Sequence, residues 1–280
     1  MALPYPFAPA TFSLGAVFVW GTSDFVGGYA AKRANAFVVT LIAHASGMLL
    51  MTALALLTHS PFPSKHCLEW ALAAGLAGGA ALAIFYRALA AGNMGLTAPV
   101  AAVLGASLPT AFGMITEGWP GAAPIAGFVL AVIGIWLISR SEDNRRPEGI
   151  GLAVLAGIGF AGFYLCAKQA GDGSALWISA TAKVASSALT GVMVLLGRSV
   201  RTLNKSGAAF GILAGFLDAT GTVLFIRASQ TGRLDSAVVL SSLYPVITVL
   251  LAKLILKEHF TRWKAAGMVA ALLAVPLIAM

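Results

Sequence analysis

The chain has 280 residues, of which 59% are hydrophobic and only 10% are charged. Ordinary soluble domains have about a quarter of their residues charged, and a soluble fold of this length has too little interior to bury so much apolar surface. The composition therefore excludes a soluble globule and indicates a chain that is solvated by lipid. The net charge of +8 is spread over short connections, which favours loops at a cytoplasmic leaflet over a nucleic-acid-binding stripe.

Ten segments have the length and the apolar character of membrane-spanning helices, since one span needs about 20 mainly apolar residues. Short polar or Pro- and Gly-rich breaks separate them. The predicted spans are residues 10–31, 36–58, 68–91, 95–116, 121–139, 150–169, 174–197, 206–230, 235–256 and 261–279. We therefore predict an all-α integral membrane protein with ten transmembrane helices.

The middle of the chain holds its most polar connection, SEDNRRPEG at residues 141–149. An offset of 140 residues pairs identical side chains on either side of it, namely Arg87 with Arg227, Gly75 with Gly215, and Phe85 with Phe225. This match predicts a duplication, with one five-helix repeat at residues 1–140 and a second at residues 150–280. Because five crossings are an odd number, the second repeat starts from the opposite side, and the inverted pair suits alternating access.

Loop charges predict the orientation in the membrane. Arg87 and Arg227 end the third span of each repeat, and we interpret them as cations that snorkel to opposite membrane surfaces. The odd-numbered connections hold thirteen lysines and arginines, against four in the even-numbered ones. By the positive-inside rule, the odd-numbered connections are predicted to be cytoplasmic and both termini to lie outside.

Three passages carry a family resemblance: WGTSDF at residues 20–25, FYRAL at residues 85–89, and SSLYPVITVLLAKLILKEHFTRWKAAG at residues 241–267. With the two five-helix halves, they resemble the drug/metabolite transporter superfamily of the EamA type along the whole chain. Glu117 before the fifth span, and Lys257 and Glu258 before the tenth, resemble a family motif in which glycine is usual where Lys257 stands. The greatest resemblance is to bacterial exporters of aromatic and other neutral amino acids, which implies export across a bacterial inner (plasma) membrane.

The first span carries a candidate binding pair. Asp24 lies four residues after Trp20, so the two side chains share one face of a helix. A carboxylate beside an aromatic ring can bind the ammonium group of a substrate, and ionisable residues inside spans normally face a cavity or a partner. The alternative is that Asp24 caps or pairs structurally at an interruption of the helix.

The seventh span carries a polar stripe at helical spacing, made of Ser179, Lys183, Ser186, Ser187 and Thr190. We expect this stripe to face the bundle interior and not lipid. Lys183 is predicted either to hold a substrate carboxylate or to pair with Asp24 or Asp218. Asp218 aligns with Gly78 of the first repeat, so it either serves an asymmetric task, such as protonation coupled to transport, or is a hydrogen-bonded structural group.

Further polar side chains complete the predicted substrate-binding set, which consists of Trp20, Asp24, Tyr86, Tyr164, Ser179, Lys183, Asp218, Ser242 and Tyr244. For the tyrosines, the alternative role is hydrogen bonding between helices. The glycine-rich segments GLAGG (75–79) and GILAG (211–215) are interpreted as sites of close helix packing. Pro99 and Pro109 in the fourth span and Pro245 in the ninth are predicted to kink their helices and to act as gating hinges.

The missing motifs narrow the functional class. No G-x-x-x-x-G-K-[ST] loop and no H-E-x-x-H motif occurs, and the four histidines are scattered, so the sequence predicts no ATP-driven pump, no metal site and no cofactor. We predict a secondary carrier, not an enzyme, that exports amino acids, aromatic or neutral, or related metabolites. The alternatives are a multidrug-type exporter, a channel or an intramembrane enzyme.

The expected partners follow from the same reading of the sequence. They are a small-molecule substrate and the lipid bilayer, without nucleic acid. A monomer suffices, because the duplicated chain supplies both halves of a transport path by itself.

Overall fold

The computed structural model describes residues 8–91, 94–139, 149–197, 205–258 and 261–278. Every regular element within these ranges is a helix. The helices are α1 (Ala8–Ala31), α2 (Ala36–Leu57), α3 (Lys65–Ala91), α4 (Met94–Thr116), α5 (Ala122–Ser139), α6 (Ile150–Gln169), α7 (Ala175–Leu196), α8 (Lys205–Thr231), α9 (Leu234–Ser241), α10 (Pro245–Leu256) and α11 (Arg262–Ile278). Each of the ten predicted spans is therefore helical, and the predicted all-α class is confirmed.

Seven segments are long and apolar enough to cross a membrane by length and composition. They are α2, α3, residues Thr97–Thr116 of α4, α6, α7, α8, and the stretch Leu234–Leu256 that contains both α9 and α10. α5 has a shorter apolar stretch, Ala122–Gly134. α1 carries Thr22, Ser23 and Asp24 near its middle, which suits a helix in the bundle interior.

The outer surface of the helices is apolar. Ile115 is 82% exposed and Leu195 is 80% exposed, and many other large apolar side chains also point outward. Monomeric soluble proteins rarely expose apolar surface on this scale. The exposed side chains therefore form the lipid-facing surface of a multi-pass membrane protein, as the composition predicts.

The ninth predicted span, residues 235–256, is divided into two helices. α9 ends at Ser241, and α10 begins with Pro245 in its first turn. Proline is tolerated at the first position of a helix, but its ring clashes with the carbonyl group four residues earlier if the helix continues through it. Pro99 and Pro109 lie instead inside the continuous helix α4, so the helix is interrupted only at Pro245 among these three prolines.

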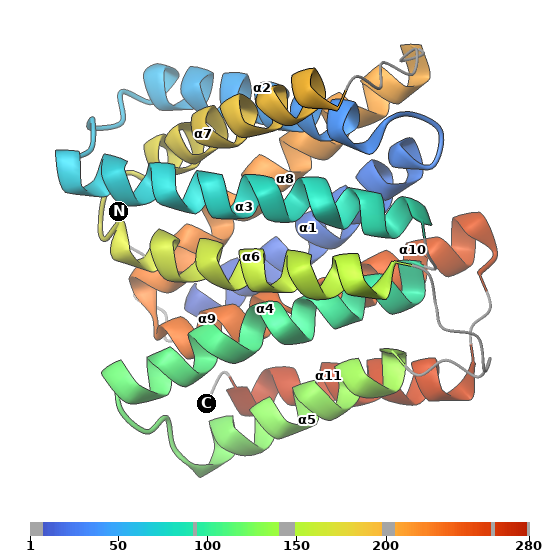
Figure 1. Cartoon of the computed structure of the whole chain (residues 1–280). Helices are drawn as coiled ribbons and strands as arrows, with labels where there is room; N and C mark the ends of the chain where they lie inside the picture. Colours follow the sequence, from blue (N-terminus) through green and yellow to red (C-terminus); the bar gives the residue numbers. More distant parts are fainter. Residues whose placement is uncertain (1–7, 92–93, 140–148, 198–204, 259–260, 279–280) are drawn as a thin grey trace.

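The helices form two layers with a helix pair at each edge (Figure 1). α3, α6 and α4 lie in the nearer layer, and α8, α1, α9 and α10 lie behind them. α2 packs on α7 at one edge, and α5 packs on α11 at the other. The most extensive other contacts join α1 to α8 and α3 to α6, so the helices of the first half pack on those of the second half.

Glycines allow two equivalent close approaches between helices. A Cβ atom at Gly75 in α3 would lie 2.1 Å from the carbonyl oxygen of Ala182 in α7, and one at Gly215 in α8 would lie 2.1 Å from that of Ala43 in α2. No real Cβ atom approaches another atom so closely, so only glycine fits at either position. The packing role predicted for the two glycine-rich segments is confirmed at these residues.

Aromatic contacts follow the same offset of 140 residues. The ring centroids of Phe85 and Phe160 are 5.5 Å apart, and those of Phe225 and Trp20 are 5.7 Å apart. Phe85 aligns with Phe225, and Trp20 aligns with Phe160. Each contact therefore joins positions that correspond when the two halves are exchanged.

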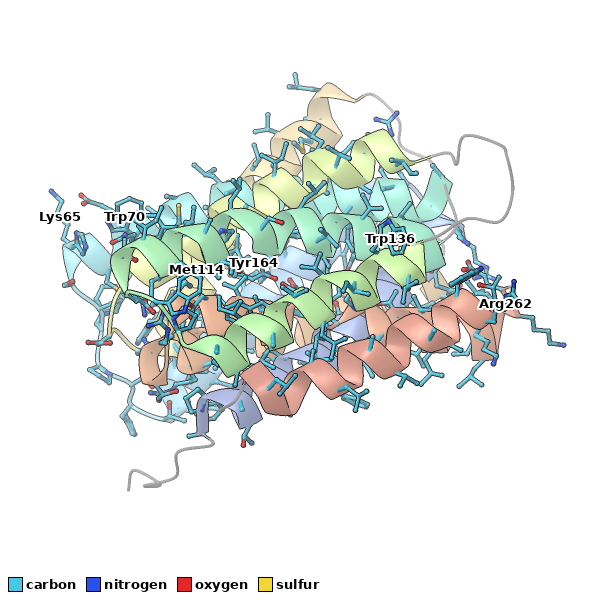
Figure 2. The ribbon with its side chains drawn as sticks, turned by 90° about the horizontal axis from the view of Figure 1, so that it is seen from below. Lys65, Trp70, Met114, Trp136, Tyr164 and Arg262 are labelled. Carbon is cyan, nitrogen blue, oxygen red and sulfur yellow. The ribbon has the colours of Figure 1, made fainter. Side chains whose placement is uncertain are left out.

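Charged and aromatic residues mark the two ends of the bundle. Arg87 and Arg227 are exposed, as expected for snorkelling cations. Lys65 and Trp70 lie at one end of the bundle, and Arg262 lies at the opposite end (Figure 2). The connection before α3 and the connection before α11 therefore lie at opposite ends of the bundle.

We expect Gly75→Ala and Gly215→Ala each to destabilise the protein by about 1–3 kcal/mol, because the added methyl group would overlap a backbone carbonyl group and force two helices apart. Gly151→Ala is the matched control, since nothing lies within 4 Å of a Cβ atom at that position. Thermal unfolding of the detergent-solubilised variants would measure the effect. Equal unfolding temperatures for all three variants would contradict the close-packing assignment.

Candidate functional site

A cavity of about 50 Å³ lies between helices of both halves of the chain. Its walls come from α1 and α3 of the first half, from α6, α7 and α8 of the second half, and from the break between α9 and α10. The predicted site residues that line it are Trp20, Asp24, Tyr164, Lys183, Asp218 and Tyr244. One water molecule needs roughly 10–15 Å³ of such space, so the cavity has room for a few waters beside these polar groups.

An ion pair joins α7 to α8 at the cavity wall. The Lys183 ammonium group donates a hydrogen bond to Oδ2 of Asp218, and the two side chains are only 8% and 11% exposed. Buried charges of opposite sign attract strongly, because little water screens them. The sequence left both Asp24 and Asp218 open as partners of Lys183, and in the structure Lys183 pairs with Asp218.

Asp24 is the second carboxylate of the cavity and is 6% exposed. No ion pair to Asp24 occurs within the part of the chain that the structure describes. Asp218 and the hydroxyl groups of Tyr86, Tyr164 and Tyr244 lie within electrostatic reach of its side chain. When Asp24, Asp218 and Lys183 are all ionised, they carry a net charge of −1, which one further cation would balance.

An aromatic cluster forms the apolar wall of the cavity around Trp20. Its ring centroid lies 6.3 Å from that of Phe163, 6.1 Å from Tyr164, 5.7 Å from Phe225 and 6.5 Å from Tyr244. The indole Nε1 of Trp20 donates a hydrogen bond of 3.2 Å to the carbonyl oxygen of Asp218. This bond fixes the indole ring and ties α1 to α8 beside the ion pair.

Three other predicted site residues lie outside the cavity lining. Tyr86 fills the notch left by Gly27, and its hydroxyl oxygen lies 3.4 Å from Oγ of Ser23. Ser179 donates a hydrogen bond of 3.4 Å to the carbonyl oxygen of Ala219 in α8. Ser242 is buried at the break between α9 and α10, where it lines a separate cavity. Tyr86 and Ser179 therefore contact neighbouring helices, and for Tyr86 this is the alternative role stated from the sequence.

The polar stripe of α7 faces the interior, as predicted. Ser179, Lys183, Ser186 and Thr190 are all buried, and Lys183 and Ser186 line the cavity. The hydroxyl group of Ser186 donates a hydrogen bond of 2.7 Å to the carbonyl oxygen of Gly75. The stripe therefore contributes one charge to the site and one hydrogen bond to the close contact between α7 and α3.

Sequence reasoning missed His44, which lies in α2 next to this site. His44 is 1% exposed, and it lies within electrostatic reach of Lys183 and close to the backbone of Gly79. Because His44 is the one ionisable residue of an otherwise apolar helix, the principle that such residues mark functional sites would have singled it out. The scattered positions of the four histidines argue only against a metal site.

A helical bundle with a lipid-facing surface and a charged, aromatic-walled cavity between its halves is typical of multi-pass membrane transporters of small molecules. Residues 147–280 match the model of the EamA-like transporter family. The second half of the chain is thus a domain of this family, and this part of the resemblance seen in the sequence is confirmed.

Solved structures also resemble this chain. One that is titled "Crystal structure of protein" has a TM-score of 0.76 and 16% sequence identity, and the match covers 96% of this chain and 95% of that chain. At this level of identity the likeness shows the fold alone. The search of curated proteins found no significant match.

We expect Lys183→Met to destabilise the protein by about 3–5 kcal/mol, because it leaves the Asp218 carboxylate buried without its partner. The double variant Lys183→Met/Asp218→Asn removes both charges, so we expect it to recover most of this loss. Lys65→Met is the control, since Lys65 pairs with Glu69 on the exposed surface of α3. Unfolding temperatures in detergent would measure all three, and a double variant as unstable as the single one would contradict the pairing.

Proposed function

We propose that this protein is a secondary carrier that exports neutral amino acids, aromatic ones above all, or closely related metabolites. The observation that carries the proposal is Asp24, a buried carboxylate that faces a cavity with an aromatic wall and has no ion-pair partner among the described residues. A substrate ammonium group supplies the cation that the site lacks. The side chain of the substrate would then pack on the rings of Trp20, Tyr164 and Tyr244.

The carboxylate of an amino acid has a partner in Lys183. A lysine ammonium group has three N–H donors, and Asp218 accepts one of them. A bound zwitterion would place its carboxylate at the remaining donors of Lys183 and its ammonium group at Asp24. Both charged ends of a neutral amino acid then have a partner in the site.

The size of the cavity supports alternating access. A benzene molecule fits an engineered protein cavity of about 150 Å³, whereas this cavity measures about 50 Å³. An aromatic substrate therefore requires the surrounding helices to separate. We propose that the repeats at residues 1–140 and 150–280 are inverted copies that move against one another, so that the path opens to one side at a time.

We place the carrier in a bacterial inner membrane, with the odd-numbered connections in the cytoplasm and both termini outside. The excess of basic residues in the odd-numbered connections supports this orientation. Since helices of both halves of one chain line the cavity, a monomer contains a complete transport path. The orientation fixes which end of the path faces the cytoplasm.

A second candidate function is the export of lipophilic cations, as in a multidrug-type carrier. When Asp24, Asp218 and Lys183 are all ionised, their net charge of −1 favours it, because a cation without a carboxylate would neutralise the cavity. The two candidates differ in one requirement, since only an amino acid needs a partner for its carboxylate. This difference makes them separable by experiment.

Uptake into proteoliposomes should distinguish these substrates. We expect saturable transport of phenylalanine and leucine, weak transport of N-acetylphenylalanine, which lacks the ammonium group, and weaker transport of phenethylamine than of phenylalanine. Preferential transport of phenethylamine would support the cation exporter instead. Accumulation that follows an imposed pH gradient would indicate proton coupling, and no saturable transport of any compound would contradict both candidates.

Asp24→Asn should raise the substrate concentration for half-maximal transport by about 100-fold, because it removes the charge that pairs with the ammonium group. Thr22→Val is the matched control, since the Thr22 hydroxyl group bonds to the Phe18 carbonyl group on its own helix at an exposed position. Equal transport by the two variants would remove Asp24 from the site. Unfolding temperatures would show that both variants are folded.

The helix break between α9 and α10, directly before Pro245, is a candidate hinge for the opening of the path. Pro245→Ala would let α9 continue into α10, so we expect the maximal transport rate to fall about tenfold with little change in half-saturation. Pro124→Ala near the start of α5 is the control, because α5 does not line the cavity. Rates equal to wild type for Pro245→Ala would contradict the hinge at this position.

A further inference from the structure

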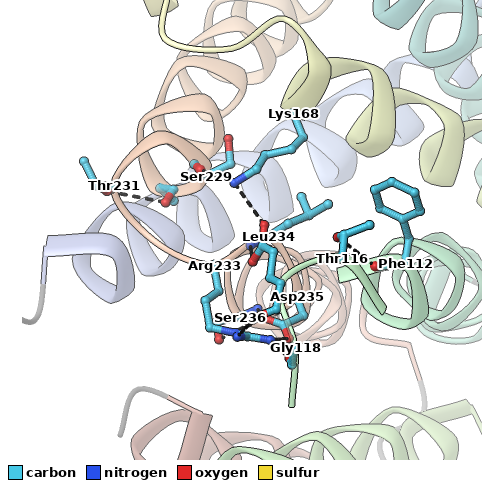
Figure 3. A network of polar contacts seen from close by, with 12 residues as sticks. Phe112, Thr116, Gly118, Lys168, Ser229, Thr231, Arg233, Leu234, Asp235 and Ser236 are labelled. Atoms are coloured by element: carbon cyan, nitrogen blue, oxygen red, sulfur yellow. Dashed lines mark hydrogen bonds and ion pairs between the residues drawn. The ribbon is translucent and has the colours of Figure 1, made fainter. Parts of the chain in front are cut away.

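An ionic contact joins the two halves of the chain at the end of the bundle where α4 ends. Glu117 directly follows α4 in the first half. Its Oε2 accepts a hydrogen bond of 2.9 Å from the N–H group of Leu234, and its Oε1 lies 3.2 Å from the Lys168 ammonium nitrogen. Both partners belong to the second half. Figure 3 shows Lys168 and Leu234 gathered here with Arg233 and Gly118.

A second ionic contact occurs where α10 ends, at the opposite end of the bundle (Figure 1). Oε2 of Glu258 accepts a hydrogen bond of 3.2 Å from the N–H group of Gly95, and its Oε1 lies 3.6 Å from the Lys32 ammonium nitrogen. Glu258 belongs to the second half, and both of its partners belong to the first. This contact therefore also joins the two halves.

The two contacts are built in the same way. Each glutamate precedes the last helix of its own half. Each lysine lies at the carboxyl end of the first helix of the other half, with Lys168 in the last turn of α6 and Lys32 directly after α1. Each N–H group belongs to the first turn of α4 or α9, where a carboxylate is favoured by the helix dipole. The arrangement therefore occurs twice, with the two halves exchanged.

We propose that these contacts are two ionic latches that close the transport path, one at each end. This inference rests on the proposed carrier function. It assigns a role to Glu117 and Glu258, which do not line the cavity. Each latch ties one half to the other, so the halves separate at one end only when the latch at that end opens. The path would then open on one side while the other latch stays closed.

Arg233 strengthens the Glu117 latch. Its guanidinium group donates hydrogen bonds to the backbone carbonyl groups of Glu117, at 2.9 Å, and of Gly118. The same group pairs with Asp235 at 2.8 Å. Hydrogen bonding to Asp235 raises the pKa of Arg233 above its already high value, so the cation persists at every physiological pH. The Glu117 latch thus fastens the loop after α4 through its backbone as well as through its carboxylate.

Reversible cross-linking tests whether the latches must open during transport. In a background with Cys67→Ala and Cys166→Ala, we would join Lys32→Cys to Glu258→Cys, or Lys168→Cys to Glu117→Cys, with a reducible bifunctional methanethiosulfonate. Each cross-link should lower amino-acid exchange in proteoliposomes about tenfold or more, and a reducing agent should restore it. The control is Lys65→Cys/Glu69→Cys, which spans an ion pair within α3 and should leave exchange unchanged when cross-linked.

Thiol accessibility gives a second readout that does not depend on transport. Thr222→Cys places one thiol in the cavity of the same cysteine-free background. Glu258→Gln and Glu117→Gln each remove one ion pair and keep an acceptor for the helix N–H group. A membrane-impermeant maleimide, applied to one face of oriented vesicles, should label Thr222→Cys faster from one face in the Glu258→Gln variant and faster from the opposite face in the Glu117→Gln variant.

The outcomes separate this inference from the proposed function. Cross-linked latch variants that exchange substrate as fast as the control would overturn the latches, and so would unchanged or same-sided labelling in both glutamine variants. If no amino acid is exchanged before cross-linking, the proposed substrate fails. The sidedness of labelling then still decides whether the latches gate the cavity.

Discussion

The charges inside the membrane spans determine how this bundle is arranged. An ionised side chain in hydrocarbon is costly, so it turns toward the interior and pairs there. Lys183 on α7 and Asp218 on α8 meet in this way, and Asp24 on α1 faces the same cavity. The three residues therefore fix the rotation of three helices about their axes, and the polar cavity lies where those helices meet.

Small residues then determine how closely the two halves approach each other. Lipid tails are as apolar as leucine side chains, so no hydrophobic force drives helices together within the membrane, and close packing and hydrogen bonds take that role. The contacts of Gly75 with Ala182 and of Gly215 with Ala43 bring backbones of the two halves together at two places, the first of them at the cavity wall. The two halves are thus closely packed around a small polar space, which cannot enlarge unless these contacts shift.

Patterns within single helices made much of this fold predictable. Hydropathy located the spans, helical spacing placed the polar stripe of α7 in the interior, and the offset of 140 residues revealed the paired helix ends. Relations between helices were not predictable. Which of the predicted partners of Lys183 it pairs with, and that the Tyr86 side chain fills a notch at Gly27, depend on how neighbouring helices are rotated and shifted. His44 was visible as the one ionisable residue of α2, but only the packing of α2 on α7 brings it near Lys183.

The two latches share their helices, and this sharing couples the two ends of the path. The start of α4 is held by Glu258 through Gly95, and the loop at its end is held to the second half by Glu117. The stretch from α9 to α10 is also held to the first half at both of its ends. Glu117 binds its first residue, Leu234, and Glu258, which lies just after α10, binds Gly95 and Lys32. Opening both ends together would release both ion pairs and leave two helix starts uncapped, so a state with one latch closed lies lower in free energy. The same contacts that join the halves would therefore disfavour a leak through the membrane, and the helix break before Pro245 would let one end move while the other stays fastened.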